Sequence, residues 1–116
     1  MIASIDMAGV KYTIDDITKE YAILKIGGLD RYLPRHARKS VTADIKLKLV
    51  KSDNGDNYEA EATLNVPDRV LTAKDSTSSM LAAIDIVEAK LLAQLHKYKD
   101  ARIMHITHRR LFSRDK

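Results

Sequence analysis

The stretch VTADIKLKLVKSDNGDNYEAEATLNV, residues 41–66, decides the fold of this chain. Apolar and polar residues alternate through VTADIKLKLV at 41–50 and again through YEAEATLNV at 58–66. A period of two is typical of a strand that buries one face and exposes the other. Asn54 and Gly55, between the two runs, favour a tight type I′ turn, so the stretch predicts an antiparallel hairpin with one apolar face.

The turn also predicts the register of the hairpin. If Asn54 and Gly55 are the two central turn residues, the numbers of paired residues add up to 109. This register places Lys48 opposite Glu61 on the solvent face and brings apolar residues together on the other face.

Two more strands are expected, one on each side of the hairpin. Pro67 and Asp68 favour a turn, after which RVLTAK at 69–74 is a third and shorter strand of the meander. The run IASIDM at 2–7 supplies a strand near the start of the chain. The sequence therefore predicts four strands.

Two segments have apolar residues at helical spacing. The clearer helix is expected from about Thr77 to Tyr98, with N-cap candidates at 76–79. Its apolar stripe consists of Met80, Ile84, Val87, Leu91, Leu95 and Tyr98. The other helix is expected to begin near Asp15 and to end at Pro34. Its apolar stripe consists of Ala22, Ile26, Leu29 and Leu33.

The order strand, helix, three-stranded meander, helix predicts an α+β fold of the type βαβββα. A helix between the first two strands favours a parallel crossover, so the four-stranded sheet is expected to be mixed, with both helices on one face. This layout is similar to that of double-stranded-RNA-binding domains. We expect one domain over residues 1–100 and a basic tail, or the start of a linker, over residues 101–116.

Positive charge is concentrated in two parts of the chain. Residues 90–116 carry eight Lys and Arg against two Asp, whereas residues 1–89 carry 12 against 14 acidic residues. Within the acidic part, residues 31–51 hold seven cations and one carboxylate. Such clustering indicates a polyanionic partner, and a solvated basic surface is the alternative.

The expected helices carry most of the candidate contact residues in their C-terminal halves or just after them. These candidates are Lys25, Arg31, Arg35, Arg38, Lys90, Lys97 and Lys99. If the helices lie side by side, these cations form one ridge. With one Phe and no Trp, exposed aromatic residues that could stack on single strands are expected to be scarce, which favours contacts to the phosphates of folded RNA.

Several residues resemble catalytic or ligand-binding groups but are better explained by local structure. Asp15 and Asp16 stand at a helix start, where carboxylates commonly cap amides. His105 and His108 lack an HExxH pattern, and the serines and threonine of 76–79 lack a nucleophile elbow. We therefore expect no enzyme activity, no metal, no cofactor and no small-molecule substrate.

The paired glycines of GGLDRYLPRHARK, Gly27 and Gly28, are not expected to cradle a phosphate. A phosphate loop needs its glycines just before the N-terminus of a helix, and a P-loop needs a following Lys-Ser or Lys-Thr. Here the glycines lie inside the helical period. Their simplest interpretation is a weak point of the helix or a close backbone approach.

The compartment is inferred from what the chain lacks. There is no cysteine, the opening MIASIDMAG has no basic leader, and no apolar run approaches the roughly 20 residues that span a bilayer. We expect a cytoplasmic protein without a membrane partner.

Three stretches are similar to one known family. LDRYLPR at 29–35, NVPDRVLTA at 65–73 and MLAAID at 80–85 resemble the ribosome hibernation-promoting and ribosome-associated inhibitor family, over about residues 1–100. The resemblance implies a βαβββα fold that occupies the decoding groove of the small ribosomal subunit, over the A and P sites. It implies contacts to 16S rRNA that exclude tRNA and mRNA, and we expect a monomer away from the ribosome.

The resemblance also singles out particular positions. Lys25 and Arg31 match basic positions of the family's first helix, and Lys90 and Lys97 match basic positions of its second. Four residues depart from the family's pattern. Relatives often carry a cation in place of Gly28 and of Ala93. They usually carry Asp in place of Ser79 and Tyr in place of Leu81. A thinner RNA footprint is therefore expected.

Two other functions fit the same residues. One is an RNA-binding protein that recognises structured RNA away from ribosomes with the same fold. The other is a small enzyme whose site has no familiar motif.

Overall fold

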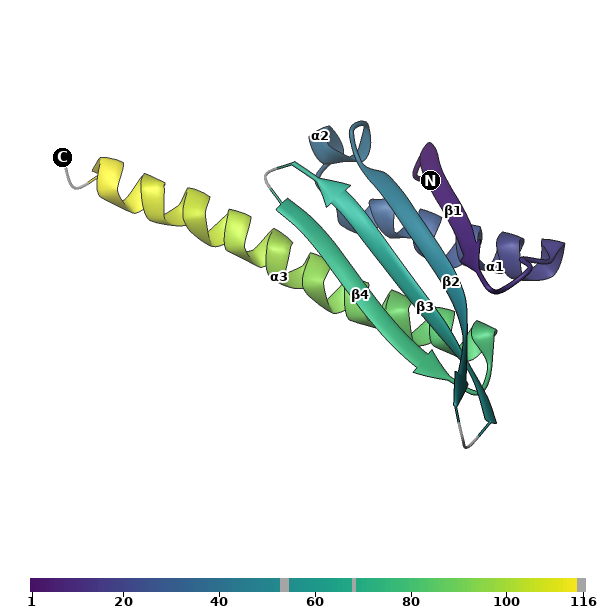
Figure 1. Ribbon diagram of the computed structural model, residues 1–116. Coiled ribbons are helices and arrows are strands. Elements are labelled where there is room, and N and C mark those ends of the chain that lie inside the picture. The colour runs from purple at the N-terminus through teal and green to yellow at the C-terminus, as the bar shows by residue number, and fades with distance from the viewer. Residues whose placement is uncertain (53–54, 68, 115–116) are drawn as a thin grey trace.

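The protein consists of one four-stranded sheet with helices packed on one face (Figure 1). The computed structural model describes the backbone of residues 1–52, 55–67 and 69–114, and the side chains of 1–51, 55–67 and 69–98. The elements are β1 (Ser4–Val10), α1 (Asp16–Gly27), the 3-10 helix η1 (Gly28–Tyr32), α2 (Arg35–Arg38), β2 (Thr42–Ser52), β3 (Gly55–Val66), β4 (Arg69–Thr77) and α3 (Met80–Arg114).

The strand order β1-β2-β3-β4 confirms the predicted α+β fold. β1 pairs with β2 in parallel, and β2, β3 and β4 form an antiparallel meander. A parallel pair needs a crossover, which α1, η1 and α2 provide. Among the described residues, no helix combines the length and the hydropathy needed to span a membrane.

The expected hairpin register was wrong by two residues. Lys48 lies opposite Glu59 rather than Glu61, and Ser52 lies opposite Gly55. Gly55, with φ of 114°, therefore belongs to the first pair of the hairpin and not to the centre of its turn. Because side chains alternate with a period of two, a shift of two residues leaves every side chain on its predicted face.

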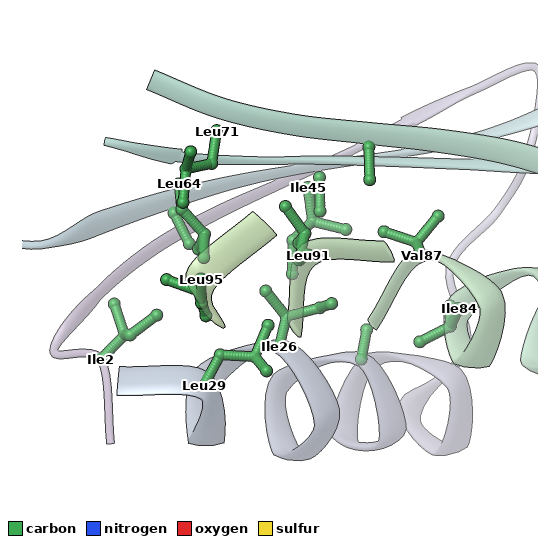
Figure 2. Close-up of a cluster of buried hydrophobic side chains, with 14 of the residues drawn as sticks. Ile2, Ile26, Leu29, Ile45, Leu64, Leu71, Ile84, Val87, Leu91 and Leu95 are labelled. Atoms are coloured by element: carbon green, nitrogen blue, oxygen red, sulfur yellow. The ribbon is translucent and has the colours of Figure 1, made fainter. Parts of the chain in front are cut away.

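The hydrophobic core lies between the sheet and the helices (Figure 2). The predicted apolar stripe of α3 is buried in full, and α3 packs chiefly on β3 and β4. From the other helical segment, Ala22, Ile26 and Leu29 enter the same core. Tyr98 completes it, with its ring buried and its hydroxyl donating to the Pro67 carbonyl at 3.2 Å.

The expected helix from Asp15 to Pro34 is divided into shorter pieces. α1 ends at Gly27, the chain continues as η1, and Leu33 is extended, as the residue before a proline prefers. Two adjacent glycines have low helix propensity, which explains the change to 3-10 geometry at this point. Leu33 remains buried, so the predicted apolar stripe is correct although the helix is not continuous.

The last helix is longer than expected at its C-terminal end. β4 extends to Thr77, so α3 begins at Met80, after Ser79, whose carbonyl accepts from the Ala83 amide at 3.0 Å. α3 continues past Tyr98 to Arg114, and the expected end near Tyr98 was wrong. The expected boundary at residue 100 falls inside this helix, and the extent of the domain stays a prediction.

Gly27 and Gly28 differ in the space around them, which gives a stability prediction. Both have right-handed backbone angles, but a Cβ on Gly27 would lie 3.1 Å from side-chain atoms of Ile5 and Met1, whereas a Cβ on Gly28 would meet nothing within 4 Å. We expect Gly28→Ala to raise the free energy of unfolding by about 0.4–1 kcal/mol. Gly27→Ala should gain less or lose stability. Urea unfolding measures both, and a destabilised Gly28→Ala protein would contradict the prediction.

Candidate nucleic-acid interface

α1 and η1 lie beside α3 and run in the same direction (Figure 1). Contacts between them keep the same order along both segments. The Tyr21 hydroxyl donates to Asp85, Lys25 contacts Glu88, and Tyr32 meets His96. The C-terminal end of η1 therefore lies next to the part of α3 around His96. The expectation that the two helical segments lie side by side is correct.

Arginines of η1 and α2 gather at this end of the helix pair. Arg31, Arg35 and Arg38 are all exposed. Arg38 donates from Nε to the Leu33 carbonyl at 3.0 Å and from Nη2 to the Arg31 carbonyl at 3.1 Å. Arg38 thus fastens α2 to η1, while Arg35 makes no ion pair or hydrogen bond among the described residues.

An aromatic contact joins η1 to α3 at the same place. The Arg31 guanidinium lies 5.0 Å from the centre of the Tyr32 ring, and that ring meets the His96 ring edge-on with centroids 5.9 Å apart. The Tyr32–His96 contact holds η1 against α3, whereas the Arg31–Tyr32 contact lies within η1. The Arg31 side chain is thereby oriented without being neutralised, because a cation–π contact leaves its charge uncompensated.

Lys97 adds charge from α3. It is exposed, follows His96 directly, and makes no ion pair or hydrogen bond within the described part of the chain. The side chain of Lys99 lies outside the described residues, as do those of His105 and His108.

Two exposed cations near this end were not among the predicted contacts. Lys39 follows Arg38 directly, and Arg69 lies over the Tyr98 ring at 5.0 Å. The sequence could have indicated Lys39, because it belongs to the basic run. It could not indicate Arg69, because the position of Arg69 depends on how β4 meets α3. We call the exposed cations at this end the basic end: Arg31, Arg35, Arg38, Lys39, Arg69 and Lys97.

Lys25 lies outside the basic end. Its Nζ is 3.6 Å from an Asp85 carboxylate oxygen and 3.8 Å from a Glu88 carboxylate oxygen, and it sits over the Tyr21 ring. Glu88 and then Tyr21 raise the pKa of Lys25. The Asp85 carboxylate, which accepts the Tyr21 hydroxyl, raises the pKa of Tyr21.

Lys90 lies on the opposite flank of α3, against the edge strand β4. Its Nζ donates to the Lys74 carbonyl at 3.1 Å and lies 3.1 Å from an Asp75 carboxylate oxygen. Gln94 donates to the Thr72 carbonyl at 2.9 Å, one turn further along. The hydrogen bond from Lys90 lowers the pKa of Asp75.

The structure therefore separates the cations that were expected to form one ridge. Lys25 faces α1 and Lys90 faces β4, so the body of α3 lies between them. The expected single ridge was wrong. On α3, Lys90 comes two residues after Glu88 and five after Asp85, so it does not share the face that holds Lys25. The carboxylate partners also come from different elements, α3 for Lys25 and β4 for Lys90.

Lys90 and Gln94 cover backbone carbonyls on an otherwise exposed strand edge. Unpaired edge carbonyls are open to water or to another chain, so side chains that bond to them fasten α3 to the sheet and block the edge. Their role in this structure is to hold β4.

This arrangement predicts the effect of changes on the β4 flank. Gln94→Ala should lower the free energy of unfolding by about 0.5–1.5 kcal/mol, since one hydrogen bond is lost. Lys90→Glu should also lower the thermal midpoint, because it puts a carboxylate beside Asp75. Lys97→Glu is the control on the same helix and should barely change the midpoint. A larger loss in Lys97→Glu than in Lys90→Glu would contradict this assignment.

The described residues include no group of three or more His, Cys, Asp or Glu that could hold a metal ion. Asp15 and Asp16 are exposed at the start of α1, and Ser79 precedes α3, so all three stand at helix starts as expected, although the Asp15 side chain makes no capping hydrogen bond. Gly27 ends α1 and Gly28 begins η1 directly after it, with the Gly28 amide already donating to carbonyls of α1, so the glycines do not form a free amide loop for a phosphate. The feature of the molecule that suits a ligand is the basic end.

A family model described as Sigma 54 modulation protein / S30EA ribosomal protein matches residues 5–103. Among curated proteins, the chain is similar to the ribosome hibernation promotion factor of Lactococcus lactis subsp. cremoris, with 33% identity over 94 residues. It is also similar to the ribosome hibernation promotion factor of Staphylococcus aureus, with 30% identity over 94 residues. The match covers 81% of this chain in both cases, but 48% and 47% of the relatives, so the chain spans about half the length of these proteins.

Solved structures share the fold. A ribosomal subunit interface protein from Coxiella burnetii superposes with a TM-score of 0.68 at 24% identity, over 84% of this chain and 98% of that one. The N-terminal domain of Protein Y from Thermus thermophilus superposes with the same TM-score of 0.68 at 22% identity, over 80% of this chain and 94% of that one.

Proposed function

This chain belongs to the Sigma 54 modulation protein / S30EA ribosomal protein family, and on that premise we propose that it is a ribosome hibernation factor. It binds 16S rRNA in the decoding groove of the small subunit, over the A and P sites. There it inhibits translation by excluding tRNA and mRNA. Two curated relatives bear the name ribosome hibernation promotion factor, which supports this role.

The basic end is the observation that carries the proposal for this molecule. Phosphate groups of folded RNA are recognised by clustered Lys and Arg, and each neutralised phosphate releases counterions. Arg31, Arg35 and Lys97 keep their charges free of carboxylates among the described residues, while Arg38 holds the shape of the cluster. The first three are therefore the main proposed rRNA contacts, with Lys39 beside them.

The proposed protein acts by occupancy and not by catalysis. It needs no cofactor, metal or small-molecule substrate, and it works in the cytoplasm, where its ribosomal partner is found. Away from the ribosome it is a monomer.

Occupancy predicts a stoichiometric effect on translation. Purified protein added to a cell-free bacterial translation system should inhibit in proportion to the fraction of small subunits occupied, and should co-sediment with small subunits in a sucrose gradient. Complete inhibition at far below one protein per ribosome would indicate an enzyme. Failure to sediment with ribosomes, together with binding to a free RNA duplex, would favour a binder of structured RNA that acts elsewhere.

Neutral substitutions at the basic end test the contact residues. Each of Arg35→Gln and Lys97→Gln should weaken small-subunit binding and reduce the slope of log affinity against log salt by about one. Lys19→Gln, which removes an exposed cation near the start of α1, is the control and should leave the slope unchanged. Thermal midpoints should change little in all three, because exposed charges contribute little to stability. Equal effects in all three variants would contradict the assignment.

A further inference from the structure

Four side chains form a cluster on the seam between α1 and α3. Tyr21 and Lys25 come from α1, and Asp85 and Glu88 come from α3. We call this cluster the carboxylate clamp, because two carboxylates lie on the one ammonium group of Lys25, at 3.6 and 3.8 Å. Asp85 is held in turn by the Tyr21 hydroxyl.

The charge of the clamp is opposite to what an RNA surface needs. Two carboxylates outweigh one ammonium group, so the clamp has a net negative charge on the same helix pair that carries the basic end. A phosphate that approaches Lys25 must compete with ligands that are already in place. It also approaches two like charges, which are incompletely screened at short range.

Space beside the clamp shows where Lys25 could go. A hollow of about 640 Å³ opens between α1, η1 and α3, and its walls include Lys25, Gly28, Arg31, Glu88 and Leu92. Lys25 and Arg31 thus border the same open space, while Lys25 is turned to the carboxylates. Without the clamp, the flexible stem of Lys25 could bring its ammonium group towards the RNA-facing side of Arg31.

Resting on the proposed function, we infer that Asp85 and Glu88 limit the affinity for rRNA by holding Lys25 out of contact with it. The RNA-facing surface then stops at the basic end, and the clamp determines how many phosphates the chain neutralises. Lys25 is a latent contact, whereas Arg31, which has no carboxylate on it among the described residues, is an active one.

The test is a pair of substitutions that keep the shapes of the side chains. Asp85→Asn and Glu88→Gln remove the negative charges, while the amide oxygen introduced by the first can still accept the Tyr21 hydroxyl. We expect affinity for purified small subunits to rise roughly twofold to fivefold for each carboxylate removed, which is the equilibrium factor that one exposed ion pair represents. The salt slope of the double variant should steepen by about one, because one more phosphate is neutralised.

Lys25→Met identifies the cation responsible. In the wild-type background it should leave small-subunit affinity and salt slope unchanged, because Lys25 is not in contact. In the Asp85→Asn, Glu88→Gln background it should remove the whole gain. Glu20→Gln is the matched control, because it removes an exposed carboxylate of α1 that makes no ion pair among the described residues, and it should give no steepening.

Three results would overturn the inference: an unchanged slope in the double variant, an equal gain in Glu20→Gln, or weaker binding by Lys25→Met in the wild-type background. If wild-type protein does not bind small subunits, the proposed function fails, and the same series is measured on an RNA duplex of about 16 base pairs. If the salt slope on the duplex is steeper in the double variant and this change requires Lys25, the clamp is supported. If the slope steepens on neither RNA, the inference is overturned. Thermal midpoints show that each variant is folded.

Discussion

The burial of the α3 stripe against β3 and β4 is the contact on which the rest of the structure depends. The sheet offers small residues there, Ala60, Ala62 and Ala73, and α3 supplies larger ones such as Leu91 and Leu95, so the two surfaces can approach closely. Each fully buried aliphatic side chain contributes about 1.5–3 kcal/mol relative to an exposed one. The described part of α1 offers fewer core residues, so α1 and η1 take their positions from α3 and the sheet.

Once α3 is fixed on the sheet, the electrostatic character of its two flanks follows. One flank meets β4, where Lys90 and Gln94 hold the strand edge, and the other meets α1, where Asp85 and Glu88 hold Lys25. The basic end, where η1 meets α3 and α2 is fastened to η1, keeps cations that no described carboxylate neutralises. Some charged side chains thus hold elements together while others face solvent, and this division follows from the packing of one helix.

Patterns of short period were sufficient to predict the fold. Alternation in β2 and β3 and the stripe of α3 indicated the elements, their order and their buried faces, because these depend on neighbours along the chain. The hairpin register depends on the exact turn, and the end of α1 depends on how two glycines meet tertiary packing, so both were mispredicted. Which cations contact a ligand stays a prediction. The sequence shows the run that holds Arg31, Arg35 and Arg38, and in the structure a hydrogen bond joins Arg38 to the Arg31 carbonyl. The Asp partners of Lys25 and Lys90, by contrast, are 60 and 15 residues away in sequence and leave no local signal.

A basic residue at a family's contact position can be engaged by its own chain before any ligand arrives. Lys25 and Lys90 match such positions, yet each has carboxylate oxygens within 3.8 Å in its own chain. An exposed ion pair is worth only about 0–1 kcal/mol, so a phosphate can compete with one carboxylate at modest cost. The cost differs between the two lysines. Release of Lys25 would leave α1 in place through its apolar contacts, but release of Lys90 would also uncover the edge of β4. Under the proposed function, Lys25 is therefore the lysine whose role RNA can change, and Lys90 stays part of the scaffold.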